Sequence, residues 1–275
     1  MVLFFQITGN QSRSIKIFQW EGGANMLTEE RQSLLLEAVN RNRSIGLNEL
    51  CQLLNTSEST IRRDLSFLAE KGLLTKVRGG AMALDEKFTP IERNMDEKSS
   101  LFVAEKDAIA RYAASLVQDG DCVFMDAGTT AGKMTEYLSV RNATFVTIAF
   151  TQAKKLAQKG YQVFVPAGEI KASTEAIVGA ECQMSLQKYH FNKCFVGVDG
   201  ISLSGGFTTP DQNEACVKTT VMNHSQEVYI LADHSKFDKI TSVTFAALNR
   251  GIIITDRLQE QKYNQYASVR EVCRD

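Results

Sequence analysis

The sequence predicts an α/β protein in which a small, helix-rich N-terminal domain precedes a larger domain with a mostly parallel β-sheet. Residues 26–84 follow helical periodicity and end in short extended pieces, whereas beyond residue 100 apolar strands alternate with amphipathic helices. The chain has 275 residues, of which 44% are hydrophobic and 23% are charged. That length and composition are typical of a globular protein with two domains.

Charge and cysteine content exclude several classes of protein. The formal net charge of -1 provides no whole-molecule field that would indicate a nucleic-acid partner, so a DNA-binding surface has to arise from local clustering. The six cysteines are scattered without a C-x-x-C pair, which argues against a zinc site and a disulfide framework. We expect neither a metal nor a cofactor. The sequence shows no secretory signal and no membrane-spanning run, so we expect a cytoplasmic protein without a membrane partner.

The first 25 residues differ from the rest of the chain. Residues 1–25 show no sustained period, whereas a helix with an acidic first turn begins soon after Met26. Codons for the peptide WEGGAN, directly before Met26, can contain GGAGG, as a bacterial ribosome-binding site would. We therefore expect translation to start at Met26 and residues 1–25 to be a mis-assigned leader. The alternative is a flexible N-terminal arm that carries Trp20.

The stretch TSESTIRRDLSFLAEKGLL, residues 56–74, predicts the third helix of the N-terminal domain. Ile61, Leu65 and Leu68 recur at i, i+4 and i+7 and form one apolar stripe, so the two adjacent arginines lie on the opposite face. Helices over TEERQSLLLEAV and NELCQLL precede it, and two short extended pieces follow it around the basic residues Lys76 and Arg78. This succession, residues 26–84, is typical of a winged helix-turn-helix.

A winged helix-turn-helix gives the arginine pair a function that the pair alone does not establish. An arginine pair on a helix is more often a solvated face. In this fold, however, the third helix enters the major groove of DNA, where arginine can donate two hydrogen bonds to guanine and hydroxyl groups can hold phosphates. Glycines at the tip of the wing would let the backbone approach DNA closely.

The C-terminal domain is predicted from an alternation of strands and helices. Residues 85–100 are polar with weak periodicity and are expected to be a linker, and residues 101–275 form the second domain. The candidate strands are CVFMDAG, ATFVTIAF, YQVFVPAG, KCFVGVDG, EVYILAD and GIIITD. Strands separated by helices predict a mostly parallel sheet covered by helices, in which ligands bind at the carboxyl ends of the strands.

Three strand ends carry polar residues that should converge: DAGTT (126–130), GVDG (197–200) and ADHSKF (232–237). Gly128 permits a tight turn, and hydroxyls and free N–H groups at the next helix start can hold a phosphate. The loop is too short for a Walker A motif, and Met134 replaces the required Ser or Thr. Lys236 can supply a cation for the phosphate. Alone, the turn could be a plain helix cap and the lysine a solvated side chain.

The chain resembles DeoR-family transcriptional regulators. The motifs are TEERQSLLLEAV, TSESTIRRDLSFLAEKGLL and KVRGGA in the first domain, and EKDAIARYAASLVQDGDCVFMDAGTT, FVGVDGISLSGGFTTPD, ILADHSKF and IITD in the second. The resemblance implies a bacterial DNA-binding regulator of carbohydrate metabolism, not an enzyme, whose sensor domain is similar in fold to ribose-5-phosphate isomerase and binds a phosphorylated sugar. GGFTTPDQNEACVK and YILADHSKF are similar to fructose-operon repressors, which implies fructose 1-phosphate. Lactose phosphotransferase repressors are the nearest alternative.

The resemblance also implies two sets of site residues. The DNA-binding set is Ser57, Ser59, Thr60, Arg62, Arg63, Lys76 and Arg78. The effector-binding set is Asp126, Gly128, Thr129, Thr130 and Lys236, with Gly197, Asp199, Gly200 and Lys218 in addition. Two positions depart from the family pattern: Ile148 stands where an Asn is usual, and Ala167 replaces the first residue of a Gly-Gly pair. Both departures would remove polar contacts with the ligand.

These observations predict a repressor of a sugar-utilisation operon. A homo-oligomer, either a dimer or a tetramer, would hold paired winged helices on operator half-sites, and the phosphorylated sugar would shift the population towards a state that binds DNA poorly. An isomerase-like enzyme would use Asp126, Asp199 and Lys236 for proton transfer. It would not need a winged helix, and the sequence has no closely spaced acid pair in a motif. An activator of the same family is the other alternative.

Overall fold

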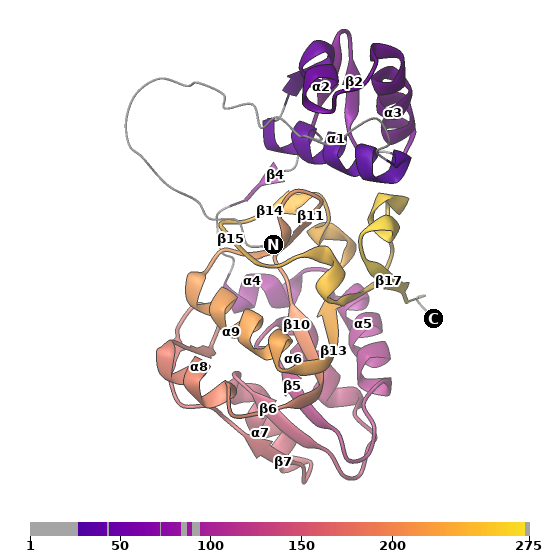
Figure 1. Ribbon diagram of the computed structural model, residues 1–275. Helices are drawn as coiled ribbons and strands as arrows, with labels where there is room; N and C mark the ends of the chain where they lie inside the picture. The colour runs from indigo at the N-terminus through magenta and orange to yellow at the C-terminus, as the bar shows by residue number, and fades with distance from the viewer. Residues whose placement is uncertain (1–26, 43, 72, 84–86, 90–93, 273–275) are drawn as a thin grey trace. The chain divides into compact units, whose positions relative to one another are not determined.

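In the computed structural model the chain divides into two compact units, residues 1–84 and 85–275 (Figure 1). The structure describes residues 27–272 except 43, 72, 84–86 and 90–93. The expected leader, residues 1–25, lies outside the described residues. None of the helices that the structure describes combines the length and the apolar character needed to cross a membrane.

The described part of the first unit is a winged helix-turn-helix. Its helices are α1 (Thr28–Asn42), α2 (Leu47–Leu53) and α3 (Glu58–Glu70), and its antiparallel sheet has the order β1 (Ser44–Gly46), β3 (Gly80–Met82), β2 (Thr75–Val77). The apolar stripe predicted on α3 is confirmed, because Ile61, Leu65 and Leu68 are all buried. Burial of this stripe fixes the rotation of α3 and turns its opposite face towards solvent.

One ion pair fastens α3 to α1. Asp64 is 2% exposed, and its carboxylate accepts hydrogen bonds from Arg31 Nε at 2.6 Å and Gln32 Nε2 at 3.0 Å. The hydrogen bond to Asp64 raises the pKa of Arg31 above its ordinary value. Asp64, which directly follows the arginine pair in the sequence, is therefore neutralised inside the domain. Its negative charge does not repel DNA phosphates from the outer face of α3.

The second unit is built on a seven-stranded sheet with the strand order β17-β16-β13-β10-β5-β6-β7. Every neighbouring pair is parallel. The strands are β5 (Cys122–Met125), β6 (Thr144–Thr147), β7 (Gln162–Phe164), β10 (Phe191–Gly197), β13 (Ser225–Leu231), β16 (Ile252–Thr255) and β17 (Ser268–Glu271). The six strands predicted from the sequence all lie in this sheet, and β17 is the one that the sequence analysis missed.

Helices cover both faces of the sheet (Figure 1). Successive side chains of a strand point to opposite faces, so Val123 and Met125 pack in one apolar cluster and Phe124 in another. The first cluster includes residues of α5 (Val103–Ser115), α6 (Thr129–Tyr137) and α7 (Phe150–Gln158), and the second includes residues of α8 (Ala180–Leu186) and α9 (Gln212–Asn223). Burial on both faces explains why the strands read as nearly continuous apolar runs.

Two elements lie in the segment that was expected to be a linker. β4 (Lys87–Phe88) pairs in parallel with β14 (Lys239–Ile240), and α4 (Met95–Ser100) follows Asn94, whose side chain accepts a hydrogen bond from Glu97 N at 2.8 Å. Both elements belong to the second unit. A two-residue strand and a helix without a buried residue leave no apolar period in the sequence, so neither was predicted.

Short elements complete the second unit. A two-stranded sheet consists of β8 (Glu169–Lys171) and β9 (Ala176–Val178). A separate three-stranded sheet consists of β11 (Gly200–Ser202), β12 (Gly206–Thr209) and β15 (Val243–Ala246). The 3-10 turn η1 (His234–Lys236) follows β13, η2 (Leu248–Arg250) precedes β16, and η3 (Gln261–Gln265) precedes β17. The turn η1 is the one that positions Lys236 for the site described next.

Candidate functional site

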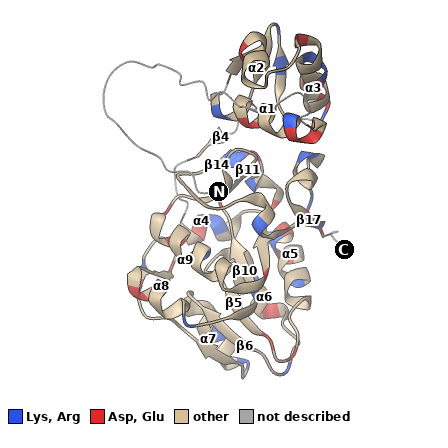
Figure 2. Cartoon of the chain, viewed as in Figure 1, with Lys and Arg blue, Asp and Glu red and all other residues tan. Residues whose placement is uncertain are grey.

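The exposed side of α3 carries most of the residues predicted to bind DNA. Ser57 is the N-cap, and its hydroxyl accepts a hydrogen bond from Thr60 N at 3.3 Å and lies 3.0 Å from the Ser59 hydroxyl. Arg62 pairs with Glu58 at 2.5 Å, with side chains 56% and 54% exposed. Arg63 is also exposed and has no ion pair with any residue that the structure describes. Figure 2 shows both signs of charge along α3.

The wing is the turn between β2 and β3. Arg78 lies in this turn, whereas Lys76 lies on β2 and donates a hydrogen bond to Ser66 Oγ of α3 at 2.7 Å. Gly79 has φ +89°, a conformation that favours glycine. A Cβ at Gly80 would lie 2.2 Å from the carbonyl oxygen of Ile45. The second glycine is therefore required for the pairing of β3 with β1, a reason that is independent of DNA.

The residues predicted to bind the effector surround one cavity near the carboxyl ends of β5, β10 and β13. Its lining includes eight of the nine, namely Asp126, Gly128, Thr129, Thr130, Gly197, Asp199, Lys218 and Lys236. They converge because the carboxyl ends of parallel strands share one edge of the sheet. Gly200 lies outside the lining, and a Cβ there would be 2.6 Å from the carbonyl oxygen of Lys239. Gly200 therefore allows β11 to approach β14.

Asp126 and Lys218 form a buried ion pair at the base of this cavity. Their side chains are 4% and 6% exposed, and the Lys218 ammonium donates to the Asp126 carboxylate and, at 3.1 Å, to the carbonyl oxygen of Gly197. The same carboxylate accepts a hydrogen bond from Gly197 N at 2.8 Å. Burial disfavours the charged lysine, but Asp126 and Glu214 together raise its pKa above the ordinary value. Lys218 therefore remains charged and fixes Asp126.

Three further lysines line the cavity from three different elements: Lys98 of α4, Lys106 of α5 and Lys236 of η1. Lys106 is 4% exposed, and its ammonium donates to the carbonyl oxygen of Lys98. Burial is the main reason that the pKa of Lys106 is lowered to about 8; the negative charge of Asp233 opposes this shift, and the positive charges of Lys236, Lys98 and Lys133 add to it. Together with the N-terminus of α6, these cations suit a phosphate ester.

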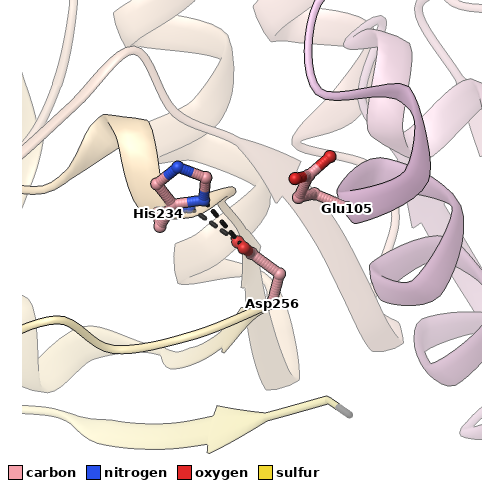
Figure 3. Close-up of side chains that lie close together, drawn as sticks. All are labelled: Glu105, His234 and Asp256. Atoms are coloured by element: carbon pink, nitrogen blue, oxygen red, sulfur yellow. Dashed lines mark hydrogen bonds and ion pairs between the residues drawn. The ribbon is translucent and has the colours of Figure 1, made fainter. Parts of the chain in front are cut away.

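Glu105, His234 and Asp256 form a cluster of side chains that lie close together (Figure 3), and His234 belongs to η1, the turn that also carries Lys236. Their ligating atoms lie within 4.8 Å of one another, close enough to hold a metal ion. Asp256, however, already accepts hydrogen bonds from His234 N and Nδ1, each at 2.7 Å. The guanidinium of Arg257 lies 3.2 Å from His234 Nε2 and 3.9 Å from the Asp256 carboxylate. Its positive charge disfavours a cation here, so the geometry favours a structural role.

Both units match models of one protein family. The DeoR-like helix-turn-helix domain matches residues 31–87, and the DeoR C terminal sensor domain matches residues 101–257. The chain belongs to the DeoR family of transcriptional regulators. It is therefore a DNA-binding regulator and not an enzyme, so the isomerase alternative is set aside.

Relatives of this DeoR-family chain are similar along most of their length. The uncharacterized HTH-type transcriptional regulator FruR of Bacillus subtilis (strain 168) is 38% identical over 88% of this chain and 96% of that protein. The lactose phosphotransferase system repressor of Staphylococcus aureus (strain N315) is 34% identical over 90% and 99%. Ribose 5-phosphate isomerase A of Methanocaldococcus jannaschii is a weak structural match, with a TM-score of 0.35 and 18% identity over 48% of this chain and 53% of that one.

The cavity of this DeoR sensor domain also contains residues that the sequence analysis missed. Lys98, Lys106, Thr174 and Glu214 all line it, and Glu214 accepts a hydrogen bond from Thr174 Oγ1 at 2.7 Å. None of these residues directly follows a strand of the main sheet. The pattern of residues at the strand ends therefore gives no signal for them, because only tertiary packing brings them to the cavity.

The two departures from the DeoR pattern do not lie in the lining of this cavity. Ile148 is 1% exposed and packs in the apolar core, and Ala167 is exposed to solvent. The buried Gln152 of α7 donates a hydrogen bond to the carbonyl oxygen of Asp126 at 3.0 Å. Its amide braces the loop after β5, a role that the sequence did not indicate.

Proposed function

We propose that this DeoR-family regulator represses a sugar-utilisation operon and leaves its operator when a phosphorylated sugar binds the sensor cavity. The observation that carries the proposal is the convergence of Lys98, Lys106 and Lys236 beside the N-terminus of α6. Several cations directed at one point, together with the free N–H groups of a helix N-terminus, can bind a phosphate dianion through charge-assisted hydrogen bonds. The hydroxyls of Thr129 and Thr130 in the same lining can donate two further hydrogen bonds.

The remaining lining suits the sugar part of such a ligand. Asp126, Asp199 and Glu214 supply carboxylate oxygens, and Thr174 adds a hydroxyl group. Besides the contacts that they already make, carboxylate oxygens can accept hydrogen bonds from sugar hydroxyls, and such polar contacts distinguish sugars that differ in the placement of their hydroxyls. Fructose 1-phosphate is our first choice, because the GGFTTPDQNEACVK segment resembles fructose-operon repressors. A phosphorylated sugar of the lactose pathway is the second, since one relative is named a lactose phosphotransferase system repressor.

On the DNA side, we propose that two winged units of a homo-oligomer occupy neighbouring operator half-sites. The recognition helix α3 enters the major groove with Arg62 and Arg63, while Ser57, Ser59 and Thr60 contact phosphates at its N-terminus. Lys76 on β2 and Arg78 on the wing contact the adjoining DNA backbone. Since several cations meet phosphates, operator binding should weaken steeply with added salt.

Titration of operator DNA tests the proposal directly. The DNA upstream of the protein's own operon is titrated by gel shift without ligand and with saturating fructose 1-phosphate, fructose 6-phosphate or tagatose 6-phosphate. We expect one of these sugars to weaken operator binding by about tenfold or more, the scale of typical allosteric coupling. DNA binding that responds to none of them would refute the sensor function. Transcription in vitro from the same DNA separates a repressor from an activator.

The affinity for the phosphorylated sugar is expected to fall as pH rises through about 8. Burial, aided by Lys236, Lys98 and Lys133, lowers the pKa of Lys106 to about 8. Below that pH its ammonium is charged and attracts phosphate, whereas above it the amine is neutral and affinity declines by up to about tenfold per pH unit. Calorimetric titration from about pH 7 to about pH 9.5 measures this decline.

The Lys106→Gln variant is the control for this pH dependence. It should bind the sugar more weakly than the wild type near neutral pH and show no decline centred near pH 8, because no amine titrates at that position. A wild-type affinity that stays constant across the range would show that Lys106 does not contact the phosphate.

A further inference from the structure

Helix α4 reaches the sensor cavity from the segment that follows the DNA-binding unit in the chain. Met95 and Lys98 both line the cavity. The Lys98 ammonium lies 2.8 Å from Asp199 Oδ1, and each of the two side chains is 17% exposed. Lys98, one of the cations of the ligand site, thus lies in the segment that connects the first unit to the rest of the chain.

The contacts that hold α4 are polar. None of its residues is buried, so apolar packing contributes little to its position. Besides the pair with Asp199, the carbonyl oxygen of Lys98 accepts a hydrogen bond from the buried Lys106, and Met95 N donates to the carbonyl oxygen of Ser173 at 3.2 Å. Two of these three contacts involve lysines of the cavity. The position of α4 should therefore depend on what those lysines bind.

The beginning of the same segment is attached beside another lysine of the cavity. β4 pairs with β14, and Thr89 N donates to the carbonyl oxygen of Ile240 at 2.9 Å. β14 comes shortly after η1, the turn that carries Lys236. Both described parts of the segment, β4 and α4, are therefore anchored to elements that supply or adjoin the cations of the site.

We propose that the phosphorylated sugar acts on α4 through Lys98. Its phosphate, held by Lys106 and Lys236, takes Lys98 as a third cation, and the Lys98–Asp199 pair is exchanged for a Lys98–phosphate contact that fixes α4 against the cavity. The inference rests on the proposed function and names the residue through which ligand binding reaches the segment joined to the DNA-binding unit.

The exchange is feasible because Asp199 keeps other partners. Its second carboxylate oxygen accepts a hydrogen bond from Thr209 Oγ1 at 3.3 Å. Burial would raise its pKa, but Lys98, Lys236 and Lys218 together hold that pKa below the ordinary value. When Lys98 turns to the ligand, the positive field of Lys218 remains. The carboxylate is therefore not left as an isolated buried charge, which would be costly.

The test uses the full chain with Lys98→Met, which removes the charge but keeps the apolar stem, and Lys98→Arg, which keeps the charge. Lys188→Met, at an exposed lysine after α8, is the matched control. Fructose 1-phosphate, fructose 6-phosphate and tagatose 6-phosphate are titrated calorimetrically, and the sugar that the wild type binds most tightly is used throughout. We expect Lys98→Met to bind it roughly tenfold more weakly, as for a lost charged hydrogen bond. Lys98→Arg and Lys188→Met should retain most of the affinity.

Two further measurements separate coupling from a purely structural role. In hydrogen exchange, residues 95–100 should become protected on ligand binding in the wild type and Lys188→Met, but not in Lys98→Met. Saturating sugar should also weaken operator binding less in Lys98→Met, so the ratio of the operator dissociation constants with and without sugar should be smaller than in the wild type. Because coupling is reciprocal, operator DNA should weaken wild-type sugar binding by that same ratio. A structural role alone would lower stability and leave this ratio unchanged.

The outcomes separate this inference from the proposed function. If Lys98→Met shows the same ratio and the same protection of α4 as the wild type at saturating sugar, the role of Lys98 is refuted while the sensor function stands. If wild-type operator binding responds to none of the three sugars, the sensor function fails and the inference fails with it.

Discussion

Lys218→Met is expected to lower the free energy of unfolding of the second unit by about 3–5 kcal/mol, because it leaves the buried Asp126 carboxylate without its cation. The two side chains are only 6% and 4% exposed, so solvent cannot replace the lost partner. The same substitution should abolish the response to the phosphorylated sugar. Asp126 directly follows β5 and precedes the turn at Gly128 that we propose to bind the phosphate, so a displaced carboxylate would disturb the end of the strand and this turn.

Urea unfolding of the full chain, followed by circular dichroism and by hydrogen exchange in β5 and β10, measures the loss. The double variant Asp126→Asn with Lys218→Met is the control, because it removes both charges and retains an acceptor for Gly197 N. It should recover most of the stability, since replacing a buried pair costs far less than breaking it. Equal unfolding midpoints for wild type and Lys218→Met would show that the pair contributes nothing.

The main sheet was predictable because its inner strands are buried on both faces. CVFM, FNKCFVG and SQEVYIL contain short apolar runs that end at polar, glycine-containing or charged loops, a pattern typical of strands in a covered sheet. β17 carries Arg270 and Glu271 and lies at the edge of the sheet, so its sequence has no comparable run. β4 is recognisable only from its pairing partner, which lies far away in the chain.

The site was predictable where topology alone brings residues together. The residues after β5, β10 and β13 had to share one edge, and the structure places them around one cavity. Lys98 and Lys106 come from helices that precede the sheet, and their approach depends on how α4 and α5 pack. Asp64 shows the same limit, because its burial against Arg31 follows from the packing of α1 on α3 and not from the local pattern.

Replacing both Arg62 and Arg63 by alanine is expected to remove most of the specific component of operator binding. A base-contacting arginine contributes about 1–3 kcal/mol of discrimination, so the double variant should lose roughly 2–6 kcal/mol if both side chains contact bases. Fluorescence anisotropy with operator and scrambled DNA, repeated over a series of salt concentrations, measures this loss. Arg41→Ala, at an exposed arginine in the last turn of α1, is the control and should change little.

The single variants assign a role to each arginine. Arg63 has no ion pair among the described residues and is free to contact DNA, whereas Arg62 is paired with Glu58. An exposed pair of this kind is worth only about 0.3–0.5 kcal/mol, so Glu58 does not prevent Arg62 from turning to DNA. Glu58→Gln should then strengthen binding if Arg62 contacts a phosphate, because an acid facing the backbone is lost. A loss on the operator alone assigns a base contact, whereas an equal loss on scrambled DNA with a shallower salt slope assigns a phosphate contact.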